Sequence, residues 1–177
     1  MFQIGESVVY GTTGVCKISA LGPLSMHGVD RKRKYYTLQP LYQEGAVYVP
    51  ADGEKCGNMR YPLSCREAEQ LLERIPEIAP CDIQNFNYKQ RTDAFSAALH
   101  LNTCDGLVGI IKAVEQKKRN FREKQQYNVD NNFWKQAMRL LCGELSYALG
   151  IPLEETRDRV EAAIRRQAPT ASDEAAI

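Results

Sequence analysis

The sequence lacks the residue patterns that most metal sites and many enzymes require. Its six cysteines contain no CxxC pair and its only histidines are His27 and His100, whereas zinc sites usually draw on closely spaced ligand pairs. The GxSxG, P-loop and dinucleotide-binding signatures are absent as well. We therefore expect free thiols, no metal or other cofactor, and no enzymatic activity.

One thiol keeps a catalytic alternative open. Cys104 follows His100 by four residues, and a nucleophile beside a base is the minimum for thiol catalysis. No orienting carboxylate stands out near this pair, and a loop is expected to separate the two residues. A thiol enzyme at Cys104 is therefore the least favoured hypothesis.

Long apolar runs are missing too. No stretch approaches the roughly 20 apolar residues that a membrane-spanning helix needs. The first residues, "MFQIGESVVY", contain no basic segment followed by an apolar one, so we expect no signal peptide. These features favour a cytoplasmic protein without membrane contact, in which disulfides are not expected.

The net charge of +1 conceals an uneven distribution of charge. Residues 79–139 carry ten Lys/Arg against six Asp/Glu, and residues 140–177 carry four against seven. A basic middle region is a weak indication of an anionic partner. The basic run "KKRNFREK" at residues 117–124 fits either phosphate contact or an ordinary solvated helix end.

Residues 1–62 have the pattern of short β-strands. "ESVVYG", "GVCKISAL", "KYYTLQPLY" and "GAVYVP" are rich in Val, Ile and Tyr, and Gly-rich or charged turns separate them. We expect a small antiparallel β-barrel of the Tudor or SH3 type. Pro50 lacks a backbone donor and should end the last strand. "GAVYVP" is thus a candidate edge strand, with internal pairing as the alternative.

From residue 63 the apolar spacing becomes helical. Ser64 and Glu67 have the spacing of a capping box, and they open a connecting helix and linker at residues 63–78. Further apolar stripes predict an all-helical bundle over residues 79–166, followed by a disordered tail at residues 167–177. The expected fold class is therefore α+β, a small barrel followed by helices.

The stretch "NFNYKQRTDAF" at residues 85–95 mixes aromatic, basic and amide side chains. Such a mixture fits the solvated first turn of a helix, and it equally fits a surface that meets DNA. The single tryptophan, Trp134, lies elsewhere in the chain. Its helical spacing with Met138 and Leu141 favours a core position over a ligand contact.

Several segments occur in an order that is typical of a known family. "FQIGESVVYGTTGVCKI", "YYTLQPL" and "VYVPAD" come first, and "NNFWKQAMRLL" with "CGELSYALG" follows in the helical half. This order resembles the CarD/CdnL family of bacterial transcription regulators over nearly the whole chain. The N-terminal Tudor-like module also occurs in the transcription-repair coupling factor. Gly11 departs from the family pattern, because proline is common at that position.

The resemblance implies a function. Members of the family bind the β subunit of bacterial RNA polymerase largely by adding an edge strand. Their helical domain approaches the upstream edge of the promoter −10 element, where a tryptophan wedges into the minor groove and basic residues touch phosphates. The open complex is stabilised without base-specific reading. The implied partners are RNA polymerase and promoter DNA, and we expect a monomeric, non-catalytic regulator.

The family's usual "NWSRR" falls on "NYKQR" in this chain. Asn87 and Arg91 match, and Tyr88 replaces the wedge tryptophan. The DNA-binding residues that the resemblance implies are Tyr88, Lys89 and Arg91. Tyrosine covers less area than tryptophan, so the main alternative is a protein–protein adaptor that has lost DNA wedging.

The polymerase contact is also altered relative to the family. Arginines that are often used on the polymerase fall at Tyr48 and near Leu24. The implied polymerase-binding residues are therefore Val47, Tyr48 and Leu24, which would make a more apolar contact.

Overall fold

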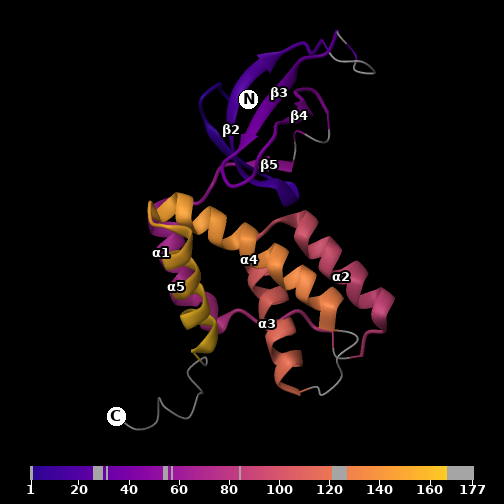
Figure 1. The fold of residues 1–177 in the computed structure, drawn as a ribbon, viewed down its shortest axis with the longest axis vertical. Coiled ribbons are helices and arrows are strands. Elements are labelled where there is room, and N and C mark those ends of the chain that lie inside the picture. The colour runs from indigo at the N-terminus through magenta and orange to yellow at the C-terminus, as the bar shows by residue number, and fades with distance from the viewer. Residues whose placement is uncertain are drawn as a thin grey trace. The chain divides into compact units, whose positions relative to one another are not determined.

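The chain divides into two compact units, Met1–Pro62 and Leu63–Ile177 (Figure 1). The computed structural model describes residues 2–25, 30, 32–53, 56, 58–83, 85–120 and 127–166, without the side chains of residues 119, 120 and 127–129. Over these residues, the first unit contains an antiparallel sheet and the second contains five α-helices. The predicted α+β class is confirmed.

The sheet of the first unit contains five strands in the order β4-β3-β2-β1-β5. These are β1 (Ser7–Tyr10), β2 (Gly14–Gly22), β3 (Tyr35–Pro40), β4 (Val47–Pro50) and β5 (Met59–Arg60). Every neighbouring pair is antiparallel. The expected barrel is correct only loosely, because the sheet is open. β5 has two residues and pairs with β1, so the ladder ends there without reaching β4.

Side chains that alternate between the two faces of the strands supply the core of this unit. Its buried members come from all five strands: Val8, Cys16, Ile18, Tyr36, Leu38, Val49 and Met59. β1 and β2 are joined by a 3-10 turn, η1 (Gly11–Thr13), and Gly14 follows it at φ 87°, a conformation that favours glycine. Burial raises the pKa of the Cys16 thiol to about 11, so this cysteine is a protonated core residue.

The second unit contains α1 (Cys65–Arg74), η3 (Ile75–Glu77), α2 (Tyr88–Leu101), α3 (Cys104–Asn120), α4 (Tyr127–Leu149) and α5 (Leu153–Arg165). Ser64 and Glu67 form the predicted capping box at α1. Ala68, Leu71 and Ile75 are buried in the helical core. Residues 63–78, expected to be a connecting segment, therefore belong to the packed helical unit. The tail expected at residues 167–177 lies outside the described residues.

The apolar stripes of α3 and α4 form the centre of the helical core. Leu107, Ile110, Ile111 and Val114 of α3 are buried, as are Met138, Leu141 and Leu145 of α4. Trp134 packs against this core and is only partly buried. Lys118 Nζ lies 4.5 Å from the centroid of its indole ring. The prediction that Trp134 packs with the core is confirmed, and its side chain lies at the margin of that core.

Candidate interaction surfaces

β4 lies at one edge of the sheet of the first unit (Figure 1). Tyr48 pairs with Thr37, and Val49 pairs with Tyr36. The Ala51 N–H donates to the Lys34 carbonyl oxygen at 2.9 Å, so that pair is hydrogen-bonded. Hydrogen-bonded pairs alternate along an antiparallel ladder. The backbone N–H and C=O of Tyr48 therefore point away from β3, toward the free edge.

The side chains of β4 divide between the two faces of the sheet. Val49 is fully buried, and Val47 packs partly buried against the same core. Tyr48 points to the opposite face and is 41% exposed. Pro50 follows two residues later and has no N–H. The edge that β4 offers is thus short and centred on Tyr48.

The three residues predicted to bind polymerase do not form one cluster. Val47 and Tyr48 share β4, whereas Leu24 follows the end of β2, on the other side of β3. Leu41 and Tyr42 are exposed in the connection from β3 to β4, and the sequence interpretation did not single them out. Their adjacency just after Pro40 was the available signal.

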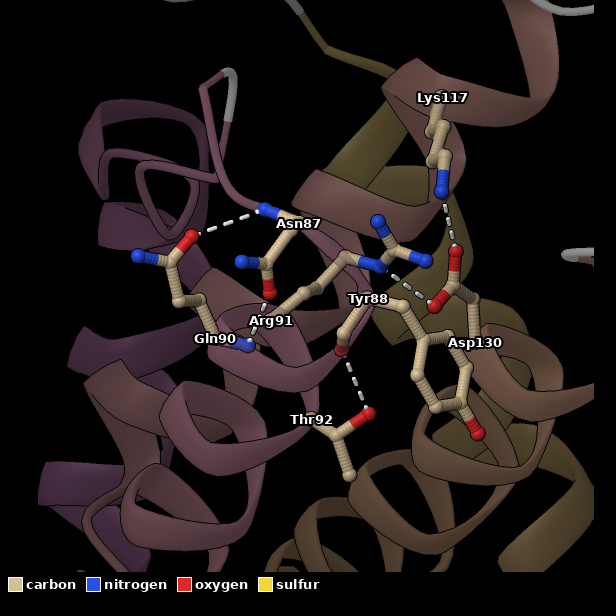
Figure 2. A network of polar contacts seen from close by, with 7 residues as sticks. All are labelled: Asn87, Tyr88, Gln90, Arg91, Thr92, Lys117 and Asp130. Atoms are coloured by element: carbon tan, nitrogen blue, oxygen red, sulfur yellow. Dashed lines mark hydrogen bonds and ion pairs between the residues drawn. The ribbon is translucent and has the colours of Figure 1, made fainter.

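The start of α2 explains the amide-rich sequence of residues 85–95. Asn87 is the N-cap, and its Oδ1 accepts a hydrogen bond from the Gln90 N–H at 2.9 Å. Gln90 Oε1 in turn accepts from the Asn87 N–H at 3.0 Å (Figure 2). The hydroxyl of Thr92 donates to the Tyr88 carbonyl oxygen. These amides fix the first turn of the helix.

Aromatic and basic side chains project from this first turn. Tyr88 is 52% exposed and Phe86 is 40% exposed, and Lys89 is exposed as well. These residues sit at the positive end of the α2 dipole, where anions are favoured. The structure thus places Tyr88 and Lys89 at the surface, as expected, and shows that the neighbouring Phe86 is exposed as well. Its place one residue before the N-cap was the signal for it.

Arg91 is in a different environment from Tyr88 and Lys89. Its Nε donates to Asp130 Oδ1 at 2.9 Å, and both side chains are 6% exposed. Lys117 Nζ lies 2.6 Å from the other Asp130 oxygen. The prediction that Arg91 touches DNA phosphates does not fit this placement, because its guanidinium is buried in an internal ion pair (Figure 2).

The possible thiol catalyst is not assembled. His100 Nδ1 lies 2.7 Å from the Ser96 carbonyl oxygen and acts as the donor there. The Cys104 thiol instead lies 3.6 Å from Glu144 Oε2. The two residues thus have different partners. In the described part of the chain, no three His, Cys, Asp or Glu residues group as a metal site would require.

Comparison with known proteins gives one match, in the first unit. The family model of the CarD-like/TRCF RID domain matches residues 2–60. No curated protein matches the chain. Among the described residues, no helix has the length and apolar character required to span a membrane. Residues 2–60 of this chain are therefore similar to the CarD-like/TRCF RID domain.

Proposed function

We propose that this chain is a non-catalytic transcription regulator with two contacts. The β4 edge binds the β subunit of RNA polymerase, and the start of α2 binds promoter DNA at the upstream edge of the −10 region. The match of residues 2–60 to the CarD-like/TRCF RID domain carries the proposal. The helical unit then modulates the stability of the open complex.

The backbone of β4 supports the proposed polymerase contact. An exposed edge strand pairs readily with an extended segment of a partner. Here the outward N–H and C=O of Tyr48 would accept such a strand, and the exposed Tyr48 ring would cover its side chains. Leu41 and Tyr42, exposed in the connection from β3 to β4, are further apolar side chains of this unit that a partner could contact. No charged pair is needed for this contact.

The start of α2 supports the proposed DNA contact. An apolar ring inserted at a distorted base step offsets an unstacking cost of about a few kcal/mol. Tyr88 and Phe86 are both exposed there, so two smaller rings take the place of one tryptophan. Lys89 and the N-terminal end of the helix provide the positive charge that phosphates require.

A binding experiment tests the polymerase contact. Purified β subunit should retain the full-length chain under conditions in which an established RID-family protein is retained. No retention of this chain, with the established protein retained in parallel, would contradict the proposal.

A kinetic experiment tests the DNA contact. Tyr88→Ala should shorten the lifetime of the open complex on a fork-junction promoter several-fold, because the ring next to the helix start is lost. Retention on the polymerase should not change. Tyr147→Ala is the matched control, since Tyr147 is a similarly exposed tyrosine on α4. An unchanged lifetime for Tyr88→Ala removes Tyr88 from the site.

The burial of Arg91 favours a second candidate function, a polymerase-bound adaptor that does not touch DNA. With Arg91 held by Asp130, the α2 start offers fewer cations to phosphates than the sequence suggests. Crosslinking from position 88 in an initiation complex separates the two functions. A crosslink to promoter DNA supports the regulator, and its absence supports the adaptor.

A further inference from the structure

Three helices meet at the carboxylate of Asp130. Asp130 lies in the first turn of α4, and its two oxygens bind different partners. Oδ1 accepts from Nε of Arg91 on α2 at 2.9 Å, and Oδ2 lies 2.6 Å from Nζ of Lys117 on α3 (Figure 2). A carboxylate is favoured at the start of a helix, and a lysine is favoured near the end of one. The local electrostatics of α3 and α4 therefore support this arrangement.

The network is buried, so each charge depends on its partner. Arg91 and Asp130 have side chains that are 6% exposed, and Lys117 is 21% exposed. Among the described residues, Asp130 is the carboxylate that pairs with Arg91. The Nη2 atom of Arg91 is buried and has no hydrogen-bond partner within that part of the chain. Breaking a buried ion pair leaves an uncompensated charge, which is strongly unfavourable.

Arg91 is directly connected to the first turn of α2. Its N–H donates to the carbonyl oxygen of the N-cap Asn87 at 3.0 Å. Its guanidinium carbon lies 5.9 Å from the centroid of the Tyr88 ring, within the range of a cation–π contact. The side chain that binds Asp130 therefore also borders the ring that is proposed to meet DNA.

We propose that Asp130 is the positioning residue of the DNA-contacting turn. By holding Arg91 it anchors the start of α2 to α3 and α4, which fixes the direction in which Tyr88 and Lys89 project. Asp130 itself touches no DNA in this arrangement. The role in DNA binding rests on the proposed function, whereas the anchoring of the turn does not.

The direction in which one substitution changes open-complex stability distinguishes a positioning role from a purely electrostatic one. Asp130→Asn removes a negative charge and raises the net charge of the network from +1 to +2, counting Arg91, Lys117 and Asp130. If only charge mattered, the variant would bind anionic DNA more strongly. If Asp130 positions the turn, the variant stabilises the open complex less well despite its extra positive charge.

Hydrogen exchange in the full-length chain measures the anchoring without DNA. In Asp130→Asn we expect amide exchange over residues 88–95 to rise at least tenfold, while exchange over α5, residues 153–165, stays unchanged. The open-complex lifetime should fall several-fold, toward that of Tyr88→Ala. The matched control is Asp93→Asn, which makes the same charge change at an exposed position of α2. It should neither raise the exchange nor shorten the lifetime.

A second variant keeps the test decisive if Asp130→Asn is unstable. Arg91→Lys retains the positive charge beside Asp130 but loses the Nε hydrogen bond and the planar group beside Tyr88. It should raise exchange over residues 88–95 and shorten the lifetime. Equal increases in exchange over α2 and α5 in both variants would overturn the proposal, since Asp130 would then support the whole helical unit.

The hydrogen-exchange and open-complex measurements also distinguish the positioning role of Asp130 from the proposed DNA contact of Tyr88. Unchanged exchange over residues 88–95 in both variants overturns the positioning role, whatever Tyr88 does on DNA. Increased exchange in Asp130→Asn with a normal open-complex lifetime in Tyr88→Ala rejects the DNA contact, and it supports Asp130 as the anchor of the turn.

Discussion

At the scale of single residues, the helical unit uses the same capping arrangement twice. Ser64 caps α1 with Glu67 as its partner, and Asn87 caps α2 with Gln90. Each box satisfies backbone donors that a helix start leaves free. Tyr88 directly follows Asn87, so the position of this cap determines where the exposed aromatic turn begins. A polar cap therefore places a residue that is proposed to act on DNA.

The cap of α1 leads to a prediction about pH. Hydrogen bonds from the Ser64 hydroxyl at 2.6 Å and the Ser64 N–H at 2.8 Å lower the pKa of the Glu67 carboxyl below its usual range. A lowered folded-state pKa contributes stability above the usual glutamate pKa, and this contribution is lost as pH falls through the lowered value. NMR titration should show that Ser64→Ala moves the Glu67 pKa upward toward its usual range. Ser64→Thr, which keeps the hydroxyl, should not, and an unchanged value in Ser64→Ala would contradict the assignment.

At the scale of secondary-structure elements, the sequence predicts contacts within one helical turn but not contacts between residues far apart in the chain. The Ser64–Glu67 spacing predicted the α1 cap, because both partners lie within one turn. The burial of Arg91 could not be read from its surroundings, because its partner Asp130 lies 39 residues away. The need for glycine at position 109 of α3 also depends on a residue far away in the sequence. A Cβ there would lie 3.1 Å from the Cys81 sulfur, a restriction that helical periodicity does not reveal.

In the sheet, too, local sequence predicts the strands but not the pairing between them. Residue types predict strands β1 to β4. Pro50 does end β4, but the expectation that this is the last strand is wrong, because the two-residue β5 follows it. The open sheet depends on how the short β5 pairs, which strand propensity does not specify. Which backbone groups of β4 are free depends on its register with β3. This register makes Tyr48, rather than Val47 or Val49, the residue whose backbone is available to a partner.

The register of β4 predicts the effect of a proline. Tyr48→Pro removes an N–H that points to the free edge, so the ladder to β3 keeps its hydrogen bonds. We expect the variant to keep most of its thermal stability and to lose most of its retention on the polymerase β subunit. Tyr48→Val, which keeps the N–H and loses only the ring, should weaken retention less. Full retention of Tyr48→Pro would mean that the partner does not pair with this edge.

At the scale of the whole molecule, the two units differ in the physics of their proposed contacts. The match to the RID family covers residues 2–60 only, so the helical unit requires evidence of its own. The proposed edge contact of the first unit would rely on backbone hydrogen bonds and apolar side chains, which salt affects little. The proposed DNA contact of the helical unit would rely on Lys89 and the α2 dipole, which salt screens. Ionic strength should therefore separate the two contacts within one chain.

Salt dependence predicts the contribution of Lys89. Each phosphate contact contributes about 0.9 to the slope of log K against log salt on duplex DNA, or about 0.7 on single strands. Lys89→Gln should therefore reduce the slope for DNA-dependent stabilisation of the open complex by about one contact, while binding to the β subunit keeps its weak salt dependence. Lys135→Gln, at an exposed lysine on α4, is the matched control and should leave the slope unchanged. An equal reduction in both variants would show that the helical unit attracts DNA through its general charge, and an unchanged slope in Lys89→Gln would remove this lysine from the phosphate contact.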